Sequence, residues 1–140
     1  MGSKTELFRT HHTQVRGLVE RIESLLDPAA ITRDPAPVAR VVVELFGKFG
    51  VHLSIEDATL YPRMMGHADI RLRQTAERFQ REMGDLKTRF DLYRSQWPGP
   101  TTIARDPEAF VAATREILVT LKRRIACEDS ELYDLYDRVA

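Results

Sequence analysis

The sequence contains only one cysteine, Cys127, so no disulfide can form within the chain. Its beginning also lacks the charged, apolar and cleavable pattern of a secretory signal. We therefore expect a cytoplasmic protein. Apolar residues nowhere continue for the ~20 positions that a membrane-spanning helix requires, so we expect no membrane partner.

A net charge of one sign is lacking as well. Lys and Arg number 21, as do Asp and Glu, which gives a formal net charge of zero. Such a chain has no overall attraction to nucleic acid, so any partner must be recognised locally, and we expect a protein partner. No phosphate-binding glycine loop, G-x-S-x-G elbow or cysteine cluster is present, and we predict a protein that is not an enzyme.

The 140 residues suffice for one hydrophobic core, and we interpret residues 1–140 as a single domain. Proline and glycine clusters interrupt the chain near residues 27–37, 65–67 and 98–107, and Asp before Pro is typical of a helix start. Between these breaks, apolar residues recur at spacings of three and four, as in helices that bury one face. The pattern predicts an all-α fold, an antiparallel up-down-up-down four-helix bundle with helices over residues 4–27, 35–65, 69–97 and 107–138.

Several polar side chains fall on the apolar faces of these expected helices. Counted along antiparallel helices, they lie at similar depths, and buried charges are costly unless they are paired or bind a metal. Helix bundles form metal sites from side chains of this kind on facing helices, and here two imidazoles and two carboxylates come from three helices. The residues concerned are His12, His52, Glu56, Arg124 and Glu128.

The segment His52-Leu-Ser-Ile-Glu56-Asp-Ala-Thr-Leu-Tyr-Pro62 resembles the H-x-x-x-E-(E/D)-x-x-L-Y-P signature of the hemerythrin (HHE) family. Residues 124–133, RIACEDSELY, are similar to the family's second signature, with Arg124 in place of the leading histidine. His12 fits the family's first-helix histidine, and Met83 stands where the third helix usually offers one.

The resemblance implies a box of about five histidines and two bridging carboxylates that holds two irons and leaves room for dioxygen. Of this set the chain retains His12, His52, Glu56 and Glu128. Three interpretations follow: a complete di-iron site, a single Fe(II), Mn or Zn ion on His12, His52 and Glu56, or no cofactor. The last is our main prediction, because the guanidinium of Arg124 would repel metal ions and could instead pair with the two carboxylates.

The predicted function is accordingly a regulatory or protein-binding hemerythrin-like module with an incomplete di-iron site. A shorter resemblance, over residues 50–56 and 124–129, is to the Rsd/AlgQ anti-sigma regulators. The alternative is an iron-binding sensor or carrier of dioxygen, nitric oxide or redox state. The sequence leaves the identity of the partner and the oligomeric state open.

Two surface features complete the sequence predictions. The outer side of the second and fourth helices is expected to carry a docking patch made of Tyr61, Tyr133 and Tyr136 with an acidic rim of Asp129, Glu131, Asp134 and Asp137. Glycines inside the second helix, Gly47 and Gly50, and inside the third, Gly84, favour a close approach of neighbouring helices, with a hinge or a docking groove as the alternative.

Overall fold

The computed structural model describes residues 4–139, and over this range the protein is all-helical with no strand. The predicted fold class is confirmed at this level. The ends of the expected domain, residues 1–3 and 140, lie outside the described residues. The longest elements are α1 (Glu6–Ser24), α3 (Ala36–Ile55), α5 (Ile70–Gln96) and α7 (Pro107–Cys127).

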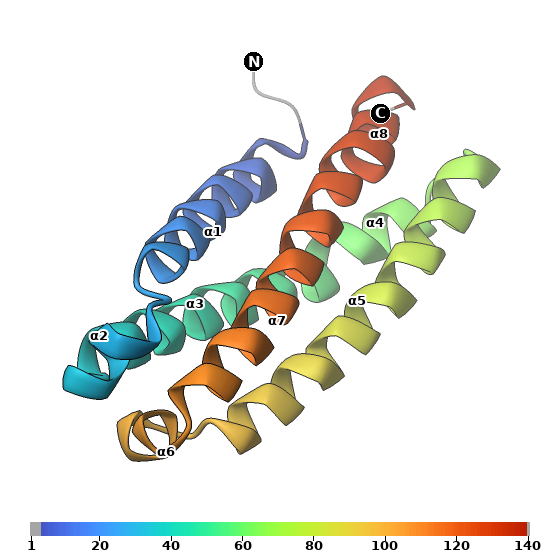
Figure 1. The fold of residues 1–140 in the computed structure, drawn as a ribbon. Helices are drawn as coiled ribbons and strands as arrows, with labels where there is room; N and C mark the ends of the chain where they lie inside the picture. The colour runs from blue at the N-terminus through green and yellow to red at the C-terminus, as the bar shows by residue number, and fades with distance from the viewer. Residues whose placement is uncertain (1–3, 140) are drawn as a thin grey trace.

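Two of the long helices continue through a π-helical turn. Helix α3 runs into η1 (Glu56–Leu60) and α4 (Tyr61–Met65), and α7 runs into η2 (Glu128–Tyr133) and α8 (Asp134–Val139). Two short helices, α2 (Pro28–Arg33) and α6 (Pro100–Arg105), fill connections for which the sequence predicted no helix. The described helices therefore number more than four. In Figure 1, α1 and α5 descend while α3 and α7 climb back, which leaves both ends of the chain at the same end of the molecule.

Aspartate side chains fix where helices begin. Asp27 and Asp106 each precede a proline, and their carboxylates accept hydrogen bonds from the backbone N–H groups of Ala29 and Ala109. Asp69 caps α5 in the same way through the N–H of Leu72. The helix starts expected at Asp-Pro pairs are confirmed at both of these sites, because the side chain satisfies an otherwise unpaired donor.

The buried apolar side chains form two separate clusters along the long axis. One contains Val15, Phe49, Met83 and Ile125, and the other contains Phe8, Leu60, Phe79 and Leu132, each with further members. Along three of the long helices, those with α1, α3 and α7, the two clusters are separated by about two turns of chain, and on α5 by about one. Buried polar side chains from the first three helices form a layer between the clusters.

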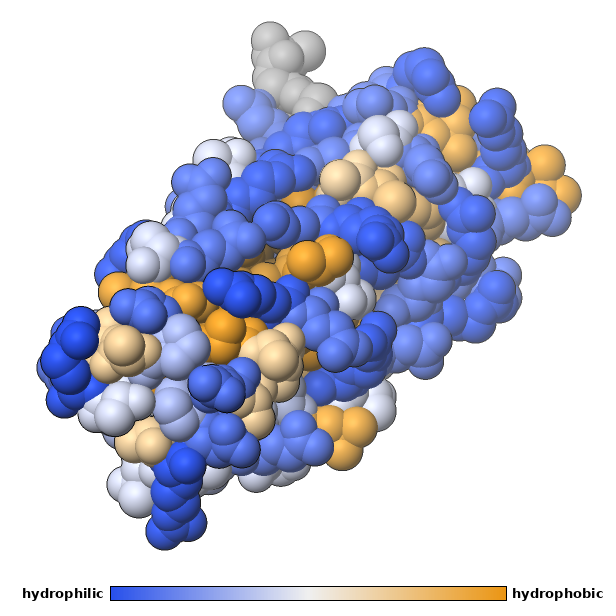
Figure 2. All heavy atoms as spheres, viewed as in Figure 1, coloured by the Kyte–Doolittle hydropathy of each residue, from blue (hydrophilic) through white to orange (hydrophobic). Residues whose placement is uncertain are grey.

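The molecular surface is largely hydrophilic on the face drawn in Figure 2, with apolar side chains gathered in smaller patches among the charged ones. Large exposed apolar residues are scattered over several helices, for example Leu7, Val51 and Leu92. Among the described helices, none combines the length and the hydropathy that a bilayer crossing requires.

Candidate metal centre

Four side chains in the layer between the two apolar clusters converge on one point: His12 from α1, His52 from α3, Glu56 at the start of η1 and Glu128 at the start of η2. We call this set the His-Glu cluster. Each of the four is at most 1% exposed. One ligand atom from each lies within 4.8 Å of the others. All four residues predicted as metal ligands are therefore brought together.

The contacts inside the cluster are short. His12 Nε2 lies 2.9 Å from Glu128 Oε1 and 3.1 Å from His52 Nε2. His52 Nε2 lies 2.5 Å from Glu56 Oε1, yet the alignment of this contact is not that of a hydrogen bond, and Glu56 Oε1 has no hydrogen-bond donor. A buried carboxylate oxygen without a donor is a position that a cation can satisfy.

The outward-facing ring nitrogens of both histidines are held from outside the His-Glu cluster. His12 Nδ1 lies 2.7 Å from Asp129 Oδ1, and Arg16 binds the other oxygen of Asp129 at 2.5 Å. This carboxylate-histidine arrangement orients an imidazole whose second nitrogen binds a metal. Asp129 follows Glu128 directly in the sequence, and its contact with His12 corrects the prediction that it belongs to an acidic surface rim.

His11 supports the second histidine of the His-Glu cluster. Its Nδ1 lies 3.0 Å from His52 Nδ1, so one of the two nitrogens donates a proton to the other. His11 itself is half-buried, beside His12 on α1. The contact with His52 had no signal in the sequence.

Two tyrosines donate hydrogen bonds to the carboxylates of the His-Glu cluster. The hydroxyl of Tyr61 donates to Glu128 Oε2 at 2.5 Å, and that of Tyr133 lies 2.9 Å from both Glu56 Oε2 and Glu128 Oε1. Both tyrosines are at most 1% exposed. Both oxygens of Glu128 accept from a tyrosine, whereas Glu56 keeps its Oε1 beside His52.

The burial of these tyrosines contradicts the prediction of an exposed docking patch. Tyr61, Tyr133 and Tyr136 are all buried rather than exposed, so they supply no aromatic surface. The acidic residues of the expected rim are also engaged within the chain. Asp134 and Asp137 pair with Arg9, and Glu131 pairs with Arg78. The patch predicted on the outer side of the second and fourth helices is therefore wrong.

Electrostatics inside the His-Glu cluster favour protonated histidines when no cation is present. Burial lowers the pKa of His52, but contacts with Glu128 and Glu56 outweigh burial and raise it to about 9. The pKa of His12 is also raised, because hydrogen bonds to Asp129 and Glu128 outweigh its burial. Protons thus occupy sites at which a metal ion would compete.

The two carboxylates of the His-Glu cluster are pushed in opposite directions. Burial raises the pKa of Glu56 to about 7. The pKa of Glu128 is held below its usual range, because the nearby imidazoles of His12 and His52 outweigh the effect of burial. Glu128 is therefore the permanent anion, and Glu56 takes up a proton more readily.

Arg124 does not join the His-Glu cluster, contrary to the sequence prediction. Its guanidinium forms an ion pair with Glu82 on α5 and lies over the ring of Phe79, 5.5 Å from the ring centre. Its side chain is 20% exposed. Helices α5 and α7 are neighbours, so a long side chain from α7 reaches the near edge of α5 without entering the layer. The guanidinium that was expected to repel a metal ion is therefore paired with Glu82 instead of with the two buried carboxylates.

The residues present fit one divalent ion and not two. Two imidazole nitrogens and two carboxylate oxygens suit Fe(II), Mn(II) or Zn(II). Helix α5, which the family resemblance expects to supply a histidine, offers only Phe79 and Met83 at this depth, and both are buried in the apolar clusters. Among residues 4–139, the one group of side chains placed to hold a metal ion is His12, His52, Glu56 and Glu128.

In the comparison with protein families, the model described as "Hemerythrin HHE cation binding domain" matches residues 3–136. Neither the comparison with curated proteins nor that with solved structures finds a match.

Proposed function

Because the chain belongs to the hemerythrin HHE cation-binding domain family, we propose that it binds a single divalent metal ion between His12, His52, Glu56 and Glu128. The observation that carries the proposal is the convergence of four buried ligand atoms, of which Glu56 Oε1 has no hydrogen-bond donor.

We also propose that the fold is a variant of the up-down-up-down four-helix bundle, in which the short helices α2 and α6 are additions to the connections.

The chain's own residues set what such a centre does. Asp129 and His11 hold the outer nitrogens of the two histidines, and the tyrosine hydroxyls orient the carboxylates, so little reorganisation accompanies metal binding. The metal supplies a Lewis acid and, if it is iron, a redox-active centre. All four side chains are buried. The site therefore suits a sensor or carrier of a small molecule better than an enzyme that turns over a substrate. A non-enzymatic role and a protein partner remain predictions.

A second candidate function is the metal-free regulatory module predicted from the sequence. It is favoured by the close His12–Glu128 and His52–Glu56 contacts, which neutralise the charges of the His-Glu cluster without any cation. The two candidates differ in a measurable property, the metal content of the protein.

The deciding experiment is a metal titration of the chelator-treated and dialysed protein with Fe(II) under anaerobic conditions, Mn(II) and Zn(II), followed by calorimetry and elemental analysis. We expect one equivalent per chain. Glu128→Gln should weaken binding at least about a hundredfold, because it removes the ligand with the most persistent negative charge. His67→Gln is the matched control, since His67 lies in the turn before α5, outside the His-Glu cluster.

Circular dichroism must show that both variants remain folded. Two equivalents per chain would contradict the single-ion proposal and favour a di-iron centre. No saturable binding of any of the three ions would leave the metal-free module as the function.

A further inference from the structure

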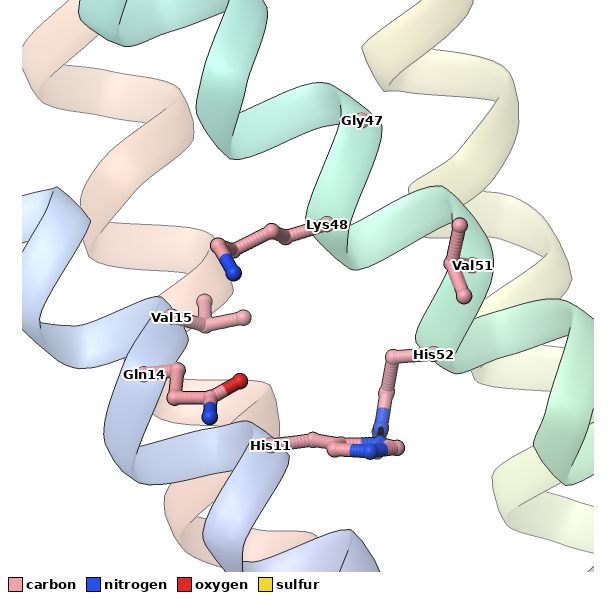
Figure 3. Close-up of a pocket in the computed structure, with 7 residues that line it drawn as sticks. All are labelled: His11, Gln14, Val15, Gly47, Lys48, Val51 and His52. Atoms are coloured by element: carbon pink, nitrogen blue, oxygen red, sulfur yellow. Dashed lines mark hydrogen bonds between the residues drawn. The ribbon is translucent and has the colours of Figure 1, made fainter.

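Beside the His-Glu cluster, a surface pocket of about 320 Å³ opens between α1 and α3. Figure 3 shows side chains from both helices lying around it, with His52 at its inner wall and Lys48 across from His11. The polar residues that line it are His11, Gln14, Lys48 and His52.

The polar lining of this pocket carries hydrogen-bond donors and no carboxylate. Glu44 lies one turn before Lys48 on α3, but it pairs with Arg21 at 3.6 Å. No ion pair or hydrogen bond joins Lys48 or Gln14 to another side chain in the described part of the protein. An ammonium and an amide therefore face the pocket without a partner from the chain.

Among the residues lining the pocket, Lys48 is the one with a permanent positive charge. His11 already uses its Nδ1 in the contact with His52. A negatively charged group in the pocket would be attracted to the ammonium of Lys48.

The remaining walls are apolar or open. Val15 and Val51 line the pocket, and Gly47 lies on α3 at its edge. A Cβ atom built on Gly47 or Gly50 meets nothing within 4 Å, so the close helix approach predicted from these glycines is wrong. At Gly47 the missing side chain instead leaves the pocket open, as in the groove alternative.

We propose that this pocket binds a small organic carboxylate, with Lys48 and Gln14 binding the charged end and the two valines contacting a short aliphatic part. A neutral ligand would leave the ammonium unpaired, and a large one would exceed the volume. The proposal is independent of metal binding, because none of the groups assigned to the carboxylate is a ligand of the proposed ion.

The test uses propionate as the probe and propionamide as its uncharged counterpart. Both are titrated at low ionic strength into the metal-free full chain, so that propionate has no metal ion to bind. Amide chemical shifts are followed by NMR. We expect saturable shifts at Gln14, Gly47 and Lys48 with propionate and none with propionamide. The proposal would be overturned if propionate and propionamide bound equally well, or if the shifts did not saturate. It would also be overturned if chloride, at the same ionic strength, competed for the pocket as well as propionate itself does.

Two pairs of variants locate the site. Lys48→Gln should weaken propionate binding at least about tenfold, because it removes a charge-assisted hydrogen bond, whereas Lys87→Gln on α5 should not. Gly47→Leu should block the pocket, while Gly50→Leu makes the same change on the same helix at a glycine that does not line it. If both leucine variants bind propionate equally well, the carboxylate does not sit in this pocket.

Discussion

Arg124 shows how one long side chain can change the character of a buried site. Its position in the sequence matches a family histidine, but its guanidinium lies at the edge of α5 with Glu82 and Phe79. Its four-bond reach allows the charge to stay near solvent while the stem covers apolar surface. The carboxylates of the His-Glu cluster therefore pair with His12 and His52 and not with Arg124.

At the residue scale, we expect Arg124→Ala to lower the free energy of unfolding by only about 1 kcal/mol, since the ion pair is partly exposed and no buried carboxylate loses its partner. Chemical denaturation at neutral pH measures the change. Arg78→Ala is the matched control, because Arg78 also pairs across helices and lies over the same Phe79 ring. A loss of ~3 to 5 kcal/mol for Arg124→Ala alone would indicate that the guanidinium serves the buried carboxylates after all.

The two π-helical turns are the element-scale feature that builds the outer part of the site. Tyr61 and Tyr133 each lie five residues after a carboxylate ligand, which in a regular α-helix turns them about 140° away from it. A π turn joins residues five apart, and Tyr133 accordingly reaches Glu128 five positions earlier. Because η1 begins at Glu56 and η2 begins at Glu128, both tyrosines face the carboxylates.

From this placement we expect Tyr133→Phe to weaken metal binding about 10- to 100-fold, because both carboxylates lose a hydrogen bond that orients them. Metal titration of the variant measures the loss. Tyr93→Phe is the control: its buried hydroxyl bonds to Thr114 in the apolar cluster away from the site. Both variants should lose stability, and only the first should lose metal affinity. Equal metal affinity in the two would contradict the role given to the π turns.

At the scale of the whole molecule, a charged layer separates two apolar clusters, so the protonation of that layer affects the stability of the entire fold. The folded pKa of His52 is raised to about 9 from 6.5 and that of Glu56 to about 7 from 4.5. Raised values mean stability that is present at low pH and lost as the pH rises through the folded pKa. Glu128, with its lowered pKa, adds stability that is lost only in acid.

We therefore expect the melting temperature of the metal-free protein to fall between pH 6 and pH 9, with a loss on the order of 3 kcal/mol from His52. Bound metal replaces the protons, so the metal-loaded protein should keep or gain stability over the same range. Differential scanning calorimetry on both forms measures this. His67→Gln should leave the trend unchanged. A metal-free melting temperature that rises from pH 6 to pH 9 would contradict the assigned charges.

The sequence alone determined the helical class, the helix starts at two Asp-Pro pairs and the four polar residues of the buried layer, because periodicity and capping are local and polar residues on an apolar face stand out. It could not place Arg124, since a flexible side chain chooses between partners that only neighbouring helices supply. It could not predict that Tyr61 and Tyr133 are buried. Their predicted outward position assumed a regular helical period, and a π turn shifts that period. Tertiary structure alone decided that His11 and Asp129 support the ligands, because these contacts join residues whose proximity depends on how the helices pack.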